Sequence, residues 1–307
     1  MVDVLVVGAG PLGASTAYHL ARRGLAVTVA DTADPRAAYR NSGGSLCWYR
    51  PDARHAAAIE RTATFVRDAV ADGAAIDCRE VPYLWMHEGV QVPALNISSP
   101  DLVAHLLAGA RANGAACVDI GRISHVTTTD GDRYVVHGDD EGLTADVVIL
   151  ALGVANIGVM PGLDGTVEKR QLFVLDLPVD DNRVRWPHTI VPVGDGFAYV
   201  FVKRFPDGLR VVVGQEGIVE DPDDTGPVDY FADLLAASVG DRFAWLRGAH
   251  VERILWGMDW SATKLPYTHD DGRGLFSINA GSAVRVCIPA GRELTDRITA
   301  RYATGTP

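Results

Sequence analysis

The chain has 307 residues, enough for one large domain or two intertwined ones, and 48% hydrophobic with 22% charged residues is typical of a well-packed globular protein. The formal net charge of −11 argues against nucleic acid or an anionic membrane as the main partner. No apolar run approaches the roughly 20 residues that a membrane-spanning helix needs, which argues against a membrane protein.

The first predicted elements are a strand, a glycine-rich turn and a helix. Val2–Val7 is an apolar run that predicts a buried parallel strand, and a helix is predicted from Leu12 to Arg23. Between them, Gly8, Gly10 and Gly13 have the spacing GxGxxG. In this pattern the first glycine permits a tight turn, the second lets a pyrophosphate approach the backbone, and the third lets the helix pack closely on the strand. The pattern therefore predicts a dinucleotide site at the helix N-terminus.

The second predicted strand, Ala26–Ala30, ends at Asp31. Asp31 stands where an acid hydrogen-bonds a ribose diol, and its charge would repel a 2′-phosphate, so NADP is disfavoured. We also assign Pro11 and Leu12, at the start of the first helix, to the cofactor site. The alternative is a glycine-rich turn without a ligand.

The next informative stretch is RNSGGSLCWYR, from Arg40 to Arg50. Its first half is too small and polar for a core, and its second half is too aromatic for an ordinary surface loop. The composition alone leaves two interpretations open: a binding loop, or a glycine-rich surface loop beside a small hydrophobic cluster.

Later elements follow the same kind of local signal. A helix is predicted after Ser99, which we expect to be its N-cap, with Pro100 in its first turn and Gly114 at its end. Strands are predicted at Phe197–Lys203 and Leu209–Gly214, joined by a turn. Val228–Val239 is predicted to be an amphipathic helix that packs on the sheet formed by these strands.

Four scattered cysteines have neither a CxxC motif nor a His-paired metal spacing. The chain enters its first strand-like run at Val2, with no basic segment or leader before it. We therefore expect reduced thiols, no metal site and a cytoplasmic location.

Together these segments resemble the FAD-dependent D-amino-acid oxidase, glycine oxidase and sarcosine oxidase family over nearly the whole chain. The resemblance implies FAD rather than NAD. In that family a small-residue loop after the second strand lies along the flavin, where backbone amides can meet its polar edge. The residues that match this loop are Arg40, Asn41, Ser42, Gly43 and Gly44. The aromatic half, Trp48 to Arg50, would then lie near the substrate.

Two further segments carry the resemblance. Gly121–Ile123 matches a strand whose backbone meets the adenine, and Ala151 and Gly153 match a motif beside the cofactor. Gly281 lies in a turn that the family places at the pyrimidine end of the flavin. A helix N-terminus there, together with Arg285, would stabilise the N1–C2=O anion of reduced flavin.

The resemblance implies an α/β fold: an FAD-binding, Rossmann-type (glutathione-reductase-like) domain with an inserted antiparallel-sheet substrate domain. We predict that residues 1–75, 97–165 and 265–307 form the discontinuous FAD-binding domain. Residues 76–96 and 166–264 would form the substrate domain.

The sequence departs from the family at three places. The segment before Pro100 is short, which predicts a more open pocket or one roofed by another subunit. Where many relatives bind the substrate carboxylate with an arginine, this chain has Asp259, which would repel a carboxylate and attract an ammonium. Asn41 stands where a tethering histidine would lie, so noncovalent FAD is expected. The lysine with which the oxidases help oxygen to accept electrons has no clear counterpart, so the electron acceptor stays open.

The predicted function is the FAD-dependent oxidation of a C–N bond in an amine or amino-acid-like substrate, by hydride transfer to flavin N5. Catalytic candidates are Tyr49, Arg50, Asp259 and Arg285. Further pocket candidates are Trp48, Tyr199, Lys203 and Trp256. The cations that could replace the missing carboxylate-binding arginine are Arg50, Lys203, Lys264 and Arg285, and the sequence does not choose among them. Oxygen or another acceptor would reoxidise the flavin, and the chain could oligomerise. The alternatives are a tailoring oxidase or monooxygenase on a larger secondary metabolite, a NAD-dependent dehydrogenase, and a non-catalytic FAD-binding subunit of a hetero-oligomer.

Overall fold

The computed structural model describes residues 2–47, 52–129, 132–139, 142–155, 159, 167–179, 187–194, 196–215, 218–219, 226–260 and 266–303. The predicted pocket residues that lie outside the described residues are Trp48, Tyr49, Arg50 and Lys264. Every helix in the described part of the chain is too short or too polar to span a membrane.

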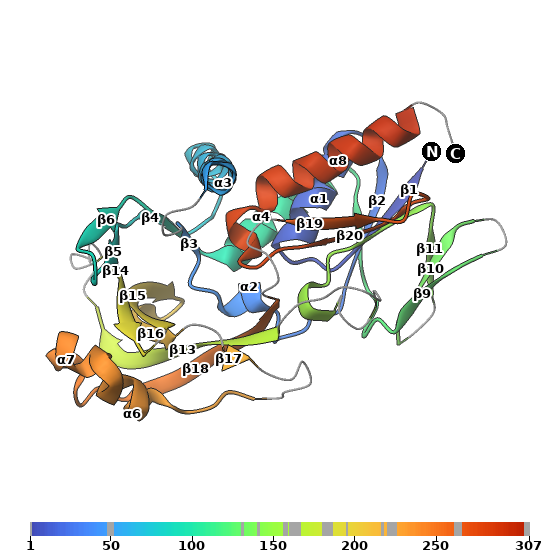
Figure 1. Cartoon of the computed structure of the whole chain (residues 1–307). Coiled ribbons are helices and arrows are strands. Elements are labelled where there is room, and N and C mark those ends of the chain that lie inside the picture. Colours follow the sequence, from blue (N-terminus) through green and yellow to red (C-terminus); the bar gives the residue numbers. More distant parts are fainter. Residues whose placement is uncertain are drawn as a thin grey trace.

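A six-stranded sheet with the order β19-β20-β12-β1-β2-β8 forms the centre of one half of the molecule (Figure 1). Its strands are β1 (Asp3–Val7), β2 (Ala26–Asp31), β8 (Ala116–Asp119), β12 (Val147–Leu150), β19 (Tyr267–Asp270) and β20 (Leu275–Asn279). All neighbours pair in parallel except the edge strand β19, which is antiparallel to β20. The carboxyl ends of the parallel strands therefore share one edge, the edge at which open α/β sheets bind ligands.

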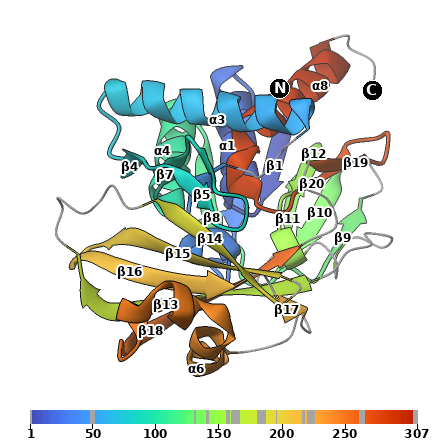
Figure 2. The ribbon, with the colours of Figure 1, turned by 60° about the vertical axis from the view of Figure 1, so that its left-hand side comes forward.

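Alternation of buried side chains along β1 gives this sheet two covered faces. Val4 and Val6 pack against a helical layer, whereas Leu5 and Val7 pack against a small antiparallel sheet. The helices of this layer are α1 (Pro11–Arg22), α3 (Ala53–Ala71), α4 (Ser99–Ala112) and α8 (Cys287–Ala303). The small sheet consists of β9 (His125–Thr128), β10 (Tyr134–His137) and β11 (Leu143–Ala145). Figure 2 shows α3 lying across the helical layer, where it contacts α8.

An eight-stranded sheet dominates the other half of the molecule. Its strands are β5 (Tyr83–Trp85), β6 (Val90–Val92), β13 (Val167–Pro178), β14 (His188–Val193), β15 (Gly196–Phe205), β16 (Gly208–Gln215), β17 (Ile218–Val219) and β18 (Val251–Trp260). All its pairs are antiparallel except β14 with β5. Short helical turns cover its outer face: α6 (Phe231–Leu234), η3 (Leu235–Val239), α7 (Gly240–Arg242) and η4 (Ala244–Leu246).

The segments between these two sheets bring them together. The short helix α2 (Ala38–Asn41) contacts β18 and lies between the two sheets (Figure 1). A third, three-stranded sheet has the order β3-β7-β4. Its strands are β3 (Ser45–Leu46), β4 (Cys78–Glu80) and β7 (Leu95–Ile97). The predicted α/β fold with a Rossmann-type sheet and a second, largely antiparallel sheet is confirmed. The domain boundaries stay a prediction.

Three local predictions need correction. The N-cap of α4 is Ser98, not Ser99, because extended Ser98 accepts a hydrogen bond from the N–H of Asp101. Gly121–Ile123 is not a strand, since Gly121 has φ +65° and its N–H is bound by the carboxylate of Asp119 in a turn.

The third correction concerns the helix predicted at Val228–Val239, which begins only at Phe231. The side-chain amide of Gln171 explains the later start: it accepts the N–H of Val228 at 2.7 Å and donates to the Val228 carbonyl at 2.8 Å. These two bonds satisfy the backbone of Val228 without a helix.

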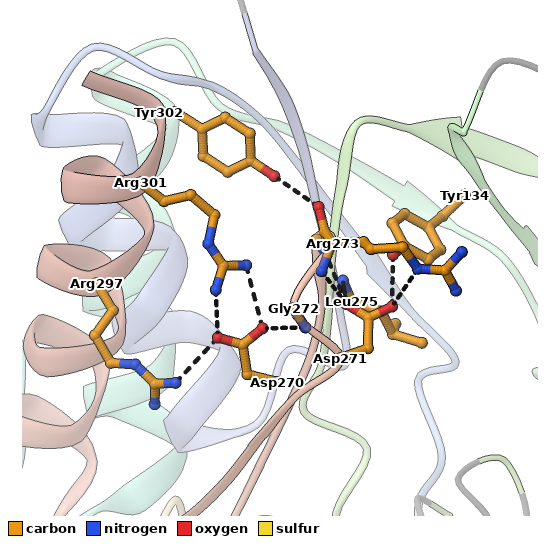
Figure 3. Close-up of polar contacts among 10 residues, drawn as sticks. Tyr134, Asp270, Asp271, Gly272, Arg273, Leu275, Arg297, Arg301 and Tyr302 are labelled. Carbon is orange, nitrogen blue, oxygen red and sulfur yellow. Dashed lines mark hydrogen bonds and ion pairs between the residues drawn. The ribbon is translucent and has the colours of Figure 1, made fainter. Parts of the chain in front are cut away.

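The β19–β20 hairpin is fastened to both neighbouring layers (Figure 3). Asp270 accepts two hydrogen bonds from Arg301 of α8, at 2.6 and 3.1 Å, and one from Arg297 at 3.2 Å. Asp271 accepts the hydroxyl of Tyr134 of β10 at 2.6 Å. Two adjacent carboxylates therefore tie the hairpin to the helical layer and to the small sheet.

Candidate functional site

The turn between β1 and α1 has the shape of a phosphate cradle. Gly8 has φ +98°, and a Cβ on Gly13 would lie 1.9 Å from the Gly8 carbonyl oxygen, so both positions require glycine. A Cβ on Gly10, by contrast, would meet only a ring carbon of Tyr39, at 3.7 Å. Gly10 caps α1 without a side chain, and the first turn of α1 has no acidic residue. The helix N–H groups are thus presented to an anion.

Asp31 and Arg40 lie together beside this turn. Asp31 closes β2, and its carboxylate accepts the N–H of Ala9 at 3.0 Å. The Arg40 guanidinium lies 3.9 Å from the same carboxylate and over the ring of Tyr39. Arg40 therefore lies beside the carboxylate that is predicted to bind the ribose.

The small-residue loop is fixed from behind by hydrogen bonds. Asn41 donates its side-chain amide to the Trp256 carbonyl at 2.6 Å, and the hydroxyls of Ser42 and Ser99 are 2.7 Å apart. The side chain of Asn96 donates to the Gly43 carbonyl at 3.0 Å. The loop backbone is therefore held in place by α4, β7 and β18.

The turn after β20 contacts the segment after β12 and the end of β18. The Asn279 side chain donates to the Gly153 carbonyl at 2.9 Å, which joins two of the predicted cofactor segments. Asp259 accepts the N–H of Ser282 and of Trp260. Burial raises the pKa of the Asp259 carboxyl, against the opposing effect of Arg170 and these N–H groups. The Asp259 carboxylate is thus engaged by two backbone N–H groups, and its predicted contact with a substrate ammonium stays a prediction.

The inner face of the eight-stranded sheet supplies aromatic and cationic side chains. Tyr199, Phe201 and Lys203 alternate on β15 and so share one face. Phe201 approaches the loop closely, since a Cβ on Gly43 would lie 3.2 Å from the end of its ring. Lys203 donates a hydrogen bond to the Ser42 carbonyl, and burial lowers the pKa of its ammonium to about 8.

Two arginines reach the same region. Arg170 of β13 is 2.6 Å from Glu168 and 3.8 Å from Asp259, and it donates to the Tyr199 hydroxyl at 3.4 Å. Arg285, in the turn η5 (Ala283–Arg285), donates its Nε–H to the Ser45 carbonyl at 2.9 Å. Burial lowers the pKa of the Arg285 guanidinium.

Comparison with protein-family models identifies the family of the chain. The family model described as FAD dependent oxidoreductase (DAO) matches residues 3–99 and 87–297. The chain belongs to this family. It is therefore an FAD-dependent oxidoreductase of the amino-acid oxidase type, and the resemblance predicted from the sequence is confirmed.

Solved structures of other proteins are similar in fold. Iminodiacetate oxidase from Chelativorans sp. BNC1 has a TM-score of 0.76 and 22% sequence identity, and the match covers 97% of this chain and 95% of that one. L-proline dehydrogenase from P. horikoshii has a TM-score of 0.80 and 14% identity, with coverage of 97% of this chain and 93% of that one. Glycine oxidase from Geobacillus kaustophilus has a TM-score of 0.74 and 18% identity, with coverage of 97% of this chain and 95% of that one. An uncharacterized oxidoreductase of Bacillus subtilis strain 168, YurR, is 51% identical over 47 residues. That match spans 15% of this chain and 13% of YurR.

The residues present fit the family's cofactor. The open Gly10 turn and the bare start of α1 suit the pyrophosphate, and Asp31 stands at the end of β2 for a ribose. Gly44 has φ +68°, and the Ile97 carbonyl of β7 occupies the place that a Cβ would take, so the loop packs closely on β7.

Two further predicted residues can be placed by their packing. The Ile123 side chain is buried in the cluster between the six-stranded sheet and the small sheet, and the predicted contact of its backbone with the adenine stays a prediction. Strand alternation places Trp256 on the face of β18 opposite to Asp259.

Sequence reasoning missed several residues of the site. They are Asn96, Glu168, Arg170, Phe201 and Asn279, together with Tyr83 and His188, whose rings form a row with that of Phe201. The period-2 spacing of Tyr199, Phe201 and Lys203 was a readable signal for Phe201. The others depend on which strands become neighbours.

We expect the Lys203→Met variant to bind FAD about tenfold more weakly, because hydrogen bonds from charged groups contribute about 1.5–3 kcal/mol and this one holds Ser42. Titration of the apoprotein by flavin fluorescence quenching measures the change. Lys203→Arg keeps a cationic donor and is the matched control. Since the pKa of Lys203 is about 8, FAD affinity of the wild-type protein should fall above that pH, whereas that of Lys203→Met should not. An unchanged Kd for FAD in Lys203→Met would contradict the idea that the hydrogen bond from Lys203 to the Ser42 carbonyl holds the loop for FAD.

Proposed function

We propose that this enzyme binds FAD noncovalently and oxidises a C–N bond of an amine or amino-acid-like substrate. The observation that carries the proposal is a wall of aromatic and cationic side chains that borders the loop at Gly43. Its members on the inner face of the eight-stranded sheet are Tyr83, Arg170, His188, Tyr199 and Phe201, and Arg285 joins them from the turn η5. The three oxidoreductases of similar fold are named for iminodiacetate, L-proline and glycine, all of which join an amine to a carboxylate.

Bound FAD supplies the redox chemistry, as the acceptor of a hydride from the substrate α-carbon. The chain's own residues would place the substrate and exclude water from it. Phe201 and Tyr199 would form an apolar floor that favours the neutral form of the amine. Arg285 would supply positive charge at the pyrimidine end of the flavin. The Asp259 carboxylate would hold the turn at Ser282 in position by accepting the backbone N–H of Ser282.

Noncovalent binding is supported by Asn41, whose amide is engaged with the Trp256 carbonyl and offers no nucleophile to the flavin. We further propose oxygen or another small acceptor as the oxidant, and a cytoplasmic location.

The visible spectrum of the purified protein, before and after heat denaturation, tests the cofactor. We expect a flavin band that passes into the supernatant on denaturation. Anaerobic stopped-flow mixing with glycine, sarcosine, L-proline, iminodiacetate and uncharged amines then tests the reaction, with flavin bleaching as the expected result. A flavoprotein that none of these bleaches would contradict C–N oxidation. A colourless protein that takes up no added FAD would contradict the cofactor itself.

A further inference from the structure

The helices α1 and α8 pack side by side on one face of the six-stranded sheet (Figure 1). They follow β1 and β20, which both pair in parallel with β12, so the two helices run in the same direction. Their backbones approach closely at Gly291, where an added Cβ would lie 2.5 Å from the Oγ and 2.8 Å from the carbonyl carbon of Ser15. Further along, Arg23 at the end of α1 donates to the Asp296 carboxylate of α8 at 2.5 Å.

A row of polar side chains is buried between these two contacts. Positions i and i+4 share a helix face, so His19 and Thr295 follow Ser15 and Gly291 along the two facing sides. Ser15 and Thr295 are 0% and 1% exposed, and His19 is half-buried. The Ser15 Oγ, His19 Nε2 and Thr295 Oγ1 are buried, and each lacks a hydrogen-bond partner within the described part of the chain. We call these three side chains the polar seam.

The polar seam is a weak point of the contact between α1 and α8. Buried polar atoms in native proteins are nearly always hydrogen-bonded, so a row of unpaired ones calls for water in the seam or for a function. Such a row stabilises the contact less than an apolar one would, because the desolvation of its polar atoms is not offset by hydrogen bonds. A positive charge in the seam would cost still more, since a buried charge is tolerated only when it is paired.

The charges around His19 oppose its protonation while the helices are packed together. Burial and three guanidinium groups lower the pKa of its imidazole to about 4, whereas Asp296, which is paired with Arg23, has the opposite effect. The guanidinium groups belong to Arg22, Arg292 and Arg23. The Tyr18 ring meets the imidazole at 5.2 Å with a phenol that is uncharged near neutral pH. A solvated histidine has a pKa of about 6.5, so parting the helices would let His19 take up a proton that the packed seam rejects.

Both helices begin at the cofactor site. α1 starts at the Gly10 turn, whose N–H groups are presented to an anion. α8 follows η5, and Arg285 of that turn donates to the Ser45 carbonyl next to the small-residue loop. The packing of α1 on α8 therefore sets the position of the anion cradle relative to this loop.

We propose that the contact between α1 and α8 is an acid-sensitive switch of the cofactor site, in which protonation of His19 parts the two helices and lowers the affinity for FAD. The inference rests on the noncovalent binding of FAD in the proposed function. Near pH 7 the imidazole is neutral, the seam is closed and FAD is retained. As the pH falls from about 6.5 toward 4, the proton stabilises the open seam and FAD is released.

The test measures FAD affinity at two pH values. Holoprotein is diluted at pH 7.5 and at pH 5, and the fluorescence of the released flavin gives the Kd. For wild type we expect the Kd to rise up to about 30-fold at pH 5, the limit set by His19 pKa values of about 6.5 in the open seam and about 4 in the closed one. His19→Gln stays uncharged, so the rise should be about tenfold smaller. His105→Gln, which alters a half-buried histidine of α4 that packs on Phe65, is the matched control and should follow wild type.

Histidine NMR covers the case in which His19→Gln does not fold. In wild-type protein with labelled histidines, the pKa of His19 should be lower with FAD bound than in the apoprotein. Equal His19 pKa values in the two forms would overturn the inference, as would a parallel rise of the Kd in wild type and His19→Gln. FAD bound equally at both pH values would contradict the switch and leave the proposed function intact. A protein that takes up no FAD at pH 7.5 would contradict the proposed function and the switch together.

Discussion

Replacement of Gly44 by alanine is expected to lower the free energy of unfolding by about 3 kcal/mol and to abolish detectable FAD binding. Gly44 has φ +68°, which an L-residue adopts only with strain, and a Cβ there would lie 1.8 Å from the Ile97 carbonyl oxygen. The contact cannot be relieved locally, because the N–H of Ile97 donates to the Gly44 carbonyl at 2.9 Å. The loop would have to leave β7, and the bare backbone proposed to face the flavin would move with it. Urea unfolding of the apoprotein and FAD titration measure the two effects.

Substitutions at two other glycines distinguish the cost of backbone strain at positive φ from the cost of steric overlap with an added Cβ. Gly24 has φ +77°, but no atom lies within 4 Å of the position that a Cβ would take, so Gly24→Ala should cost about 1 kcal/mol and leave FAD binding unchanged. Gly43→Ala adds no φ strain and meets only the Phe201 ring, at 3.2 Å, so its effect on stability should be smaller than that of Gly44→Ala. FAD binding by Gly44→Ala at wild-type affinity would contradict the proposed packing of the loop against the cofactor.

Local sequence signals predicted the nucleotide-binding half well, because its key features lie within a few residues of each other. The spacing of Gly8, Gly10 and Gly13 predicted a strand, turn and helix that the structure places within one or two residues of the expected bounds. The N-cap of α4 was misassigned by one residue because Ser98 and Ser99 are equally good caps. Tertiary contact decides between them, since Ser99 is held by the hydroxyl of Ser42.

Most residues of the proposed substrate-facing wall could not be predicted from the sequence, because they are brought together by strand pairing rather than by local spacing. Tyr83 and His188 become neighbours only because β5 and β14 pair in parallel, with His188 opposite Tyr83. Arg170 enters the site through the pairing of β13 with β18, which sets Glu168 opposite Asp259. Strand register over such separations depends on the whole sheet, and a shift of one residue would turn every one of these side chains to the other face.

The Asp271→Ala variant is expected to lose about 3–4 kcal/mol of stability at pH 7, the largest effect that we predict far from the site. One oxygen of this carboxylate accepts the N–H groups of Arg273, Gly274 and Leu275 at 2.8, 2.9 and 3.0 Å, and the other accepts the Tyr134 hydroxyl at 2.6 Å (Figure 3). Alanine removes all four bonds from a side chain that is only 17% exposed. Chemical unfolding of the matched apoproteins measures the loss.

The pH dependence of this loss follows from the ionisation of Asp271. Burial opposes its charge, but the hydrogen bonds from Tyr134 and the turn N–H groups outweigh burial and hold the pKa of the carboxyl below its ordinary value of 3.8. The folded state therefore binds the proton more weakly than the unfolded state, so the stabilisation is complete above about pH 4 and is lost as the pH falls through the folded-state pKa. The stability difference between wild type and Asp271→Ala should be constant from about pH 5 to 8 and shrink in acid. Asp241→Ala, which removes an exposed carboxylate paired with Arg247, should cost at most about 1 kcal/mol at any pH. A difference for Asp271→Ala that persists undiminished in acid would mean that the side chain's volume, rather than its charge, supports the hairpin.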